Sequence, residues 1–410
     1  MSRRVLITGR GCVSGLGQGL GPSWEALAAG RGAIRPLSRR AADDPAHAYE
    51  GPAAFVEALD PAPLLARFGP RPFAGLDPMT AFAFAATHEA LEEAALADRP
   101  DLLAEAAVLY GSGAGGVSTL EEGYLRLLHK GAGNVHPTTV PRQMLSGPAS
   151  HISMSWGVRG PVFALASACS SSAHALGEAM HRIRSGRSQI VIAGGAEACI
   201  TYGSWRGWQA LRAMAPDTCR PFSLGRQGMV LGEGAATLVL ESEESAAARS
   251  ATVYGELLGE GATSDAHHIT APSGEGAVRA LRLAHADAGV PLDAPLLYSA
   301  HGTGTLLNDR TEAAALREVY GEALARDVVI ATKSAHGHLI GAGGALELLL
   351  GMEALRAGTA PPVLNGLGPD PEAAAPVAWE PTPLATDLLV SASFAFGGLN
   401  SVLVARAVAS

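Results

Sequence analysis

Short apolar runs alternate with helix-like stretches along most of this chain, and this alternation restricts the possible folds more than any other feature of the sequence. A short apolar run between turn residues is typical of a strand that is buried on both faces. In the first half, such runs cover residues 4–7, 107–109, 162–165, 190–193 and 236–240. Helical patterns cover residues 23–29, 80–97 and the segment after Cys169.

The same alternation starts again after residue 250. Strands are predicted at 253–258, 296–299, 328–331, 388–392 and 401–404, and helices at 276–288, 309–320 and 341–356. The first strand of each half is followed or interrupted by glycines, so we expect a duplicated α/β unit with largely parallel strand pairing. Residues 35–72 are expected to form an irregular insertion, and residues 361–383 a loop.

The net charge of −9, from 30 basic and 39 acidic residues, argues against nucleic acid as the main partner. A local basic patch could still bind an acidic partner. The candidates for such a patch are Arg67 and Arg71, Arg126 with His129 and Lys130, and Arg206 with Arg212.

The sequence also bears on the cellular compartment. It has no run of about 18 uncharged apolar residues, so no membrane span is expected. The N-terminus turns strand-like at once and lacks the features of a secretory signal. The four cysteines have no paired spacing, which favours a reduced, cytoplasmic environment.

Cys169 lies in a turn of small residues at the predicted start of a helix, where Leu176, Met180 and Ile183 recur at helical spacing. Free backbone N–H groups and the helix dipole favour a thiolate at such a position. The alternative is a small buried thiol with no chemical role. This segment alone does not decide between the two.

Polar side chains follow three predicted strands of the second half. His301, Lys333 with His338, and Phe396 lie at or just beyond these strand ends, where sites form in α/β sheets. A cysteine at a helix start with histidines at two strand ends is the set of groups expected for thiol-based acyl transfer. Each residue could instead be structural, and a metal site from His301, His336 and His338 is conceivable, although no tetrahedral ligand spacing stands out.

Rival motifs fit the sequence less well. The glycines after the first strand, residues 9–15, miss the dinucleotide-binding spacing. None of the tyrosines is followed four residues later by lysine, and no G-x-S-x-G elbow of an α/β-hydrolase occurs.

Four motifs in order resemble those of the β-ketoacyl-acyl-carrier-protein synthases, the elongating condensing enzymes of the thiolase superfamily, and of type II polyketide ketosynthases. They are the Cys169 segment, His301-Gly302-Thr303-Gly304-Thr305, Thr332-Lys333-Ser334 with Gly337-His338, and Phe396-Gly397-Gly398. The resemblance implies a thiolase-like, duplicated five-layer α-β-α-β-α sandwich. Residues 1–250 would form the half with the nucleophile, and residues 251–410 the half with the His and Lys residues and a gate loop.

The resemblance also implies a reaction. Cys169 would accept an acyl group, and malonyl-acyl-carrier protein would be decarboxylated with help from His301 and His338, giving a 3-oxoacyl chain two carbons longer. No redox cofactor or catalytic metal is implied, because the substrates are carried on the phosphopantetheine of an acyl carrier protein. A homodimer, or a heterodimer with a chain length factor, is expected.

The remaining roles come from the same resemblance. They are an oxyanion hole from the N–H groups of Cys169 and Phe396, a gate at Phe396 and Ala395, pantetheine binding by Thr303 and Thr305, ordering of the charge network by Lys333, support from Glu347 and Asp309, and an acyl pocket at Ala114 and Thr139.

Departures from the usual motifs concern the substrate. Ala395 replaces a glycine that usually begins the gate loop, and could stiffen it. Ala114 is small where a bulky residue often limits the acyl pocket, and Thr139 lies where aromatic residues are common. These changes favour a specialised synthase, for a polyene or another polyketide, as much as ordinary fatty-acid elongation. The alternative function is a non-catalytic, chain-length-factor-like partner, which the retained Cys169 disfavours.

Overall fold

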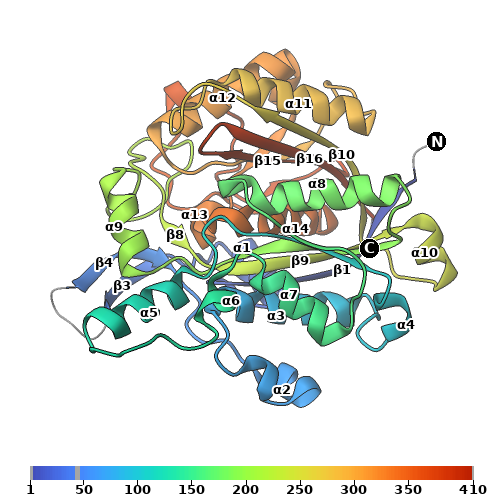
Figure 1. The fold of residues 1–410 in the computed structure, drawn as a ribbon. Helices are drawn as coiled ribbons and strands as arrows, with labels where there is room; N and C mark the ends of the chain where they lie inside the picture. The colour runs from blue at the N-terminus through green and yellow to red at the C-terminus, as the bar shows by residue number, and fades with distance from the viewer. Residues whose placement is uncertain (1–2, 42–46, 409–410) are drawn as a thin grey trace.

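The computed structural model describes residues 3–41 and 47–408 and shows five alternating layers (Figure 1). Two central helices lie between the two halves of one large sheet, and further helices cover the outer face of each half. The central helices are α8 (Ser171–Arg184) and α14 (Gly343–Ala357). The outer helices include α3 (Pro78–Glu93) and α7 (Gly147–Trp156) on one side, and α11 (Glu275–Ala288) and α12 (Leu306–Tyr320) on the other. The predicted α-β-α-β-α sandwich is confirmed.

Each half of the sheet contains five main strands in the same order. The N-terminal half runs β6-β5-β7-β9-β1, and the C-terminal half runs β12-β11-β15-β16-β10, so both read 3-2-4-5-1 in chain order. The first set is β1 (Val5–Ser14), β5 (Ala107–Gly111), β6 (Val162–Leu165), β7 (Ile190–Glu197) and β9 (Gly234–Ser242). The second set is β10 (Gly255–Ser264), β11 (Leu297–Ser299), β12 (Val328–Ile330), β15 (Leu388–Ala395) and β16 (Leu399–Ala407). All ten overlap the strands predicted from the sequence, and β1 pairs with β10 where the halves meet.

The expectation of largely parallel pairing is wrong. In each half only the second strand is parallel to its two neighbours: β5 to β6 and β7, and β11 to β12 and β15. The fourth, fifth and first strands pair antiparallel. An apolar run that is buried on both faces looks the same in either direction, so the pattern could not distinguish them.

The glycines of β1 and β10 have a common physical reason. Both strands shift register, between Ile7 and Gly9 and between Leu257 and Gly259. A Cβ on Gly9 would lie 2.1 Å from the carbonyl oxygen of Ala90 in α3, and one on Gly259 would lie 2.5 Å from the backbone nitrogen of Ala288 in α11. Glycine therefore allows an outer helix to pack directly on the first strand of each half, which explains the repeated glycine pattern in the sequence.

A large apolar core lies in the innermost layer. Residues from both halves form one core there, including Leu176 of α8 and Leu348 of α14. Nearly all of α14 is buried, as expected for a helix that is apolar all round. Gly344 lies so close to Ala173 that a Cβ would approach that side chain to 2.9 Å. The two central helices are thus held in close contact, and the residues at their N-terminal ends share one region.

Two other expectations need correction. Residues 35–72 are not wholly irregular: β3 (Arg35–Arg40) and β4 (Ala48–Ala54) form an antiparallel pair, α2 (Ala62–Phe68) follows, and residues 42–46 lie outside the described residues. The many proline and alanine residues of this segment made its strands look like an irregular loop in the sequence. The prediction that residues 162–165 form a buried strand is also wrong. They form β6 at the edge of the sheet, where the side chain of Phe163 is 53% exposed.

The sequence patterns did not identify α5 (Val117–Leu128) or α9 (Tyr202–Ala210). Residues 361–383 are mostly irregular, as expected. Among the described residues, none of the helices has the length and apolar character needed to cross a bilayer.

Candidate active site

Cys169 lies in a 3₁₀ turn, Ala168–Ser170, immediately before α8. The turn is tight enough to hold Ala168 at a φ of +50°. The sulfur is 3.1 Å from Nε2 of His338, and the backbone N–H of Phe396 donates towards it. Burial raises the pKa of the Cys169 thiol to about 12, although Lys333 and the Phe396 N–H oppose the shift. The thiolate expected from the helix start stays a prediction, and burial acts against it, so a base next to the sulfur would assist its deprotonation.

His301 and His338 come together beside this sulfur. His301 directly follows β11 and His338 follows α13 (Lys333–His336), and their ring centroids are 5.4 Å apart at an angle of 84°. One ligand atom from each of Cys169, His301 and His338 lies within 4.8 Å of the others. Burial lowers the pKa of both imidazoles well below the usual value, and the charge of Lys333 lowers it further. Both rings are therefore neutral near pH 7.

Lys333 connects His301 to a buried carboxylate. Its Nζ lies 2.6 Å from Oε1 of Glu347, donates to the carbonyl oxygen of His301 at 2.6 Å, and lies 3.4 Å from Nδ1 of the same residue. Burial raises the pKa of Glu347, and the Lys333 charge acts against that shift. An ammonium group has donors and no acceptor, so Nδ1 of His301 accepts and the ring proton lies on Nε2.

Carboxylates on α12 shape the loop that carries His301. Glu312 accepts from the backbone N–H of His301 at 2.8 Å and from that of Gly302 at 2.9 Å. Asp309 accepts from Gly304 N–H at 3.1 Å and from Phe222 N–H at 2.8 Å. Asp309 therefore supports the loop without touching the cysteine, as does Glu312, to which the sequence gave no role.

A cavity of about 360 Å³ leads to Cys169. Four positions predicted for the pantetheine site and the gate line it: Thr303, Thr305, Ala395 and Phe396. The hydroxyls of the two threonines are 2.9 Å apart. Apolar side chains surround its mouth, including Leu211, Ile269, Leu306 and Leu307, which are 50–70% exposed. Among the described residues, the lining of this cavity includes neither Ala114 nor Thr139.

The gate loop follows β15. The ring of Phe396 packs against Trp208 of α9, with centroids 5.8 Å apart and planes inclined by 30°, and Gly397 N–H donates to Ile269 at 2.7 Å. Ala395 is the last strand residue and has no positive φ, so its backbone needs no glycine. The sequence gave no indication of Trp208, because no motif surrounds it.

A buried carboxylate on β7 links the two halves near Cys169. Glu197 accepts from the backbone N–H groups of Gly113 at 2.7 Å, Ala114 at 3.1 Å and Gly341 at 2.9 Å, and from the hydroxyl of Ser112 at 3.1 Å. Burial raises its pKa to about 7. Sequence reasoning placed Glu197 only within a motif; its contacts show that it fixes Ala114 and the turn after His338.

The histidine trio considered from the sequence does not form. Nε2 of His336 lies 2.9 Å from the Thr332 hydroxyl and Nδ1 lies 2.7 Å from the carbonyl oxygen of Gly337, so both ring nitrogens are used locally. Within the described parts of the chain, the metal-ligating group that does converge consists of Cys169, His301 and His338.

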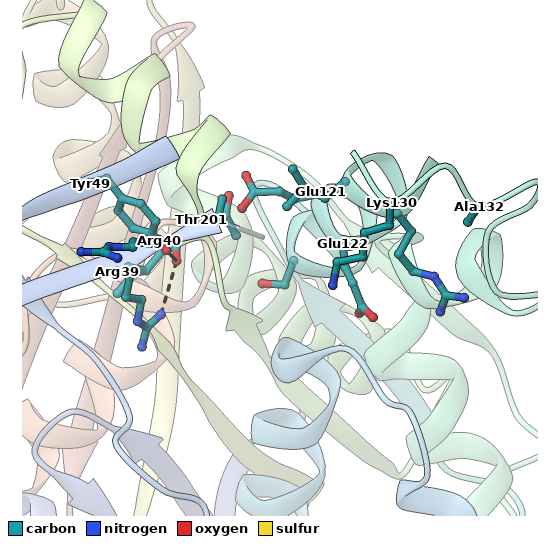
Figure 2. A pocket seen from close by; sticks show the side chains of 13 residues that line it. Arg39, Arg40, Tyr49, Glu121, Glu122, Lys130, Ala132 and Thr201 are labelled. Carbon is teal, nitrogen blue, oxygen red and sulfur yellow. Dashed lines mark hydrogen bonds between the residues drawn. The ribbon is translucent and has the colours of Figure 1, made fainter. Parts of the chain in front are cut away.

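A second hollow, of about 630 Å³, lies between β3 and α5 (Figure 2). Arg39 and Arg40 line one side, and Glu122 and Lys130 line the other. It includes Arg126 and Lys130 from the predicted basic positions and none of the residues around Cys169. Another basic candidate, Arg212, lines the Cys169 cavity itself, whereas Arg206 bonds to Gln209 and to the carbonyl of Ala48.

Known protein families account for this combination of fold and site. Residues 2–246 match the model of the β-ketoacyl synthase N-terminal domain, and residues 254–366 match that of the C-terminal domain. The chain therefore belongs to the β-ketoacyl synthase family, whose members are acyltransferase-class condensing enzymes.

Particular relatives cover the whole chain. Nodulation protein E of Rhizobium meliloti (strain 1021) is 40% identical over 100% of both chains. The 3-oxoacyl-[acyl-carrier-protein] synthase 2 of Synechocystis sp. is 35% identical over 98% of this chain and 97% of its own length. Among solved structures, the ishigamide ketosynthase/chain length factor matches with a TM-score of 0.91 and 32% identity over 100% of both chains.

Proposed function

We propose that this chain catalyses the decarboxylative condensation of an acyl thioester on Cys169 with malonyl-acyl-carrier protein, releasing 3-oxoacyl-acyl-carrier protein and carbon dioxide. The observation that carries the proposal is the placement of the Cys169 sulfur 3.1 Å from one neutral imidazole and beside a second, at the inner end of a cavity.

In the first half-reaction, the thiol is the nucleophile. Because its pKa is about 12, Nε2 of His338 accepts the proton as sulfur attacks the incoming thioester. The backbone N–H groups of Cys169 and Phe396 stabilise the oxyanion of the tetrahedral intermediate. The carrier thiol leaves with the proton, and the acyl group stays on Cys169.

In the second half-reaction, the malonyl thioester loses carbon dioxide and the electron pair of the broken C–C bond forms an enolate. The Nε2–H of His301 donates to the enolate oxygen, which suits a neutral ring whose proton Lys333 already fixes on Nε2. His338 donates to the same oxygen once its ring proton has moved from Nδ1 to Nε2, a change of tautomer that leaves the ring neutral. The carbanion attacks the acyl carbon, the new C–C bond forms, and the C–S bond to Cys169 breaks to restore the thiol after protonation.

The substrate arm would occupy the cavity described above. Thr303 and Thr305 offer hydroxyls to a phosphopantetheine chain, and Phe396 closes or opens the route to Cys169. Glu347 and Asp309 hold Lys333 and the Gly304 loop in place from outside the reacting atoms.

The acyl chain would lie beyond Cys169, on the side of Ala114 and Thr139. Glu197 fixes the backbone of Ala114, whose small side chain leaves room. Thr139 is buried at the start of α6 (Thr139–Gln143). These two residues support a specialised acyl substrate, an unsaturated or polyketide chain. Turnover of saturated and polyunsaturated acyl-carrier substrates tests this point, and equal or better turnover of saturated chains would contradict it.

The protein partners follow from two surfaces. The apolar mouth of the cavity, with Arg212 on its wall, fits an acidic acyl carrier protein. The unpaired edge of β6, where Phe163 is more than half exposed, fits a second subunit, either a copy of this chain or a chain length factor. Met154 of α7, the helix that packs on β6, is also more than half exposed. A division of the chain near residue 250 is a further proposal, which the repeated strand order supports.

The test is acyl transfer followed by intact-protein mass spectrometry. Acyl-carrier protein should add one acyl group to Cys169, and malonyl-carrier protein should then release the 3-oxoacyl product. Cys169→Ala should lose both steps, whereas Cys12→Ala, which removes another buried free thiol, should retain them. Acylation of a residue other than Cys169, or no acylation of a folded protein, would refute the proposal.

A further inference from the structure

The groups around Cys169 form a metal-ligating set as well as a catalytic one. Cys169, His301 and His338 are 7%, 3% and 2% exposed, and their ligand atoms lie within 4.8 Å of one another. One thiolate and two imidazoles with an open fourth side are a donor set that Zn²⁺ takes in catalytic sites, and the cavity provides that open side. A Zn²⁺ ion bound there would coordinate the Cys169 sulfur and prevent it from acting as a nucleophile.

The surroundings of His301 are the reverse of those of a metal-bound histidine. A metal-bound imidazole usually donates its second N–H to a carboxylate or carbonyl oxygen, which leaves the other nitrogen free to coordinate. Here a donor, Nζ of Lys333, faces Nδ1 at 3.4 Å. Nδ1 must accept, so Nε2 holds the proton and has no lone pair for a metal.

Lys333 cannot easily turn away from this position. Its side chain is 1% exposed, and Nζ is held at 2.6 Å from both Glu347 Oε1 and the carbonyl oxygen of His301. Its positive charge at short range also opposes the entry of a divalent cation into a buried site.

We propose that Lys333 has a second role: its ammonium group holds His301 in the tautomer that keeps the Cys169–His301–His338 cluster closed to divalent metal ions such as Zn²⁺. The protein thereby keeps its nucleophile free in the presence of thiophilic cations. This role is additional to condensation and does not depend on which acyl chain the protein uses.

Cobalt(II) is a suitable probe because bonding to a thiolate produces a charge-transfer absorption band. The variant Lys333→Met/Glu347→Gln removes the buried pair together, so neither charge is left alone. This variant should show the cobalt–thiolate band and bind Co²⁺ about 10–100-fold more tightly than the wild type, the usual effect of an outer-shell partner on metal affinity. The same variant with Cys169→Ser is the matched control, and it should lose the band although the other three cysteines remain.

Two results would overturn the proposal. A wild-type protein that shows the band with the affinity of the double variant would mean that Lys333 does not close the site. A double variant that melts like the wild type but shows no band would mean that the cluster is not a metal site. If the double variant fails to fold, the wild type still decides: Zn²⁺ should not protect Cys169 from alkylation by iodoacetamide, and protection would refute the proposal.

Discussion

The two halves of the sheet have one strand order and divide the chemistry unequally. In the N-terminal half, the ends of β5, β6 and β7 lead to Ala114, Cys169 and Glu197. At the corresponding ends of β11, β12 and β15, the C-terminal half supplies His301, the segment from Lys333 to His338, and Phe396. The scaffold therefore provides equivalent positions. In the proposed function, the residues at the strand ends of one half bind the acyl group, and those of the other half supply the proton transfer and the charges.

The sharpest comparison is between the starts of the central helices. Each follows a 3₁₀ turn whose first residue has an unusual positive φ: Ala168 at +50° before α8, and Ile340 at +43° before α14. Cys169 thus corresponds to Gly341. A Cβ on Gly341 would lie 2.3 Å from the backbone nitrogen of Gly113, whereas the Cys169 side chain faces the cavity. The same strained turn can carry a nucleophile in only one of the two halves.

The largest expected effect tests the separate roles proposed for His338 and His301. His338→Ala should reduce condensation by about 10²–10⁴-fold, the usual contribution of general acid–base catalysis, and should also slow acylation, because Nε2 of His338 is the group 3.1 Å from the sulfur. His301→Ala should reduce condensation similarly but leave acylation much less affected. Single-turnover acylation, followed by steady-state condensation, separates the two.

His181→Gln is the control for the histidine variants. His181 lies on α8, the helix that begins directly after the turn of Cys169, but its side chain is 48% exposed and pairs with Glu260, so both rates should stay at wild-type values. Equal losses of acylation in the His301 and His338 variants would show that the two rings are interchangeable, and would contradict the separate roles assigned to them.

A smaller effect is expected at the counterpart of Cys169. Gly341→Ala should lower the free energy of unfolding by about 1–3 kcal/mol, since overpacking against backbone forces a shift. Gly207→Ala, in helix α9 with no atom within 4 Å of the added Cβ, should instead be neutral or stabilising by up to about 1 kcal/mol. Thermal or urea unfolding measures both, and a wild-type midpoint for Gly341→Ala would mean that the two turns are equally roomy.

The smallest effect concerns pH. Burial raises the folded-state pKa of Glu197 from 4.5 to about 7, so the folded state binds this proton more tightly than the unfolded state does. Its contribution to stability is complete below about pH 4.5 and is lost as the pH rises through about 7. Glu197→Gln should therefore make the fall in unfolding free energy over this window less steep, by at most about 1.4 kcal/mol per pH unit.

The matching carboxylate of the C-terminal half provides the comparison for Glu197. Glu312 also has a pKa raised to about 7 by burial and holds backbone N–H groups next to a catalytic residue. Glu312→Gln should make the free energy of unfolding fall less steeply with pH over the same window. An unchanged slope in both variants would show that neither group titrates between folded and unfolded states as inferred.

Local patterns were enough to predict much of this fold and site. The ten main strands appeared as apolar runs, because most of them are enclosed by helices or by the neighbouring half, the edge strand β6 being the clearest exception. Cys169, His301 and His338 were chosen as candidates because they lie at a predicted helix start and at predicted strand ends, whereas the role expected of Lys333 came from the resemblance to the synthase family. Trp208 escaped detection, since a lone tryptophan on a helix looks like ordinary packing until the gate loop lies against it.

The sequence by itself determined the alternation of strands and helices, the repeat, and the choice of candidate reacting groups, because periodicity and residue chemistry act over a few residues. Only the tertiary structure decided which strands pair antiparallel, that burial raises the pKa of the Cys169 thiol, and that Lys333 faces Nδ1 of His301. Those properties depend on distances between atoms that are far apart along the chain, and on the exclusion of water that arises once both halves have packed around the central helices.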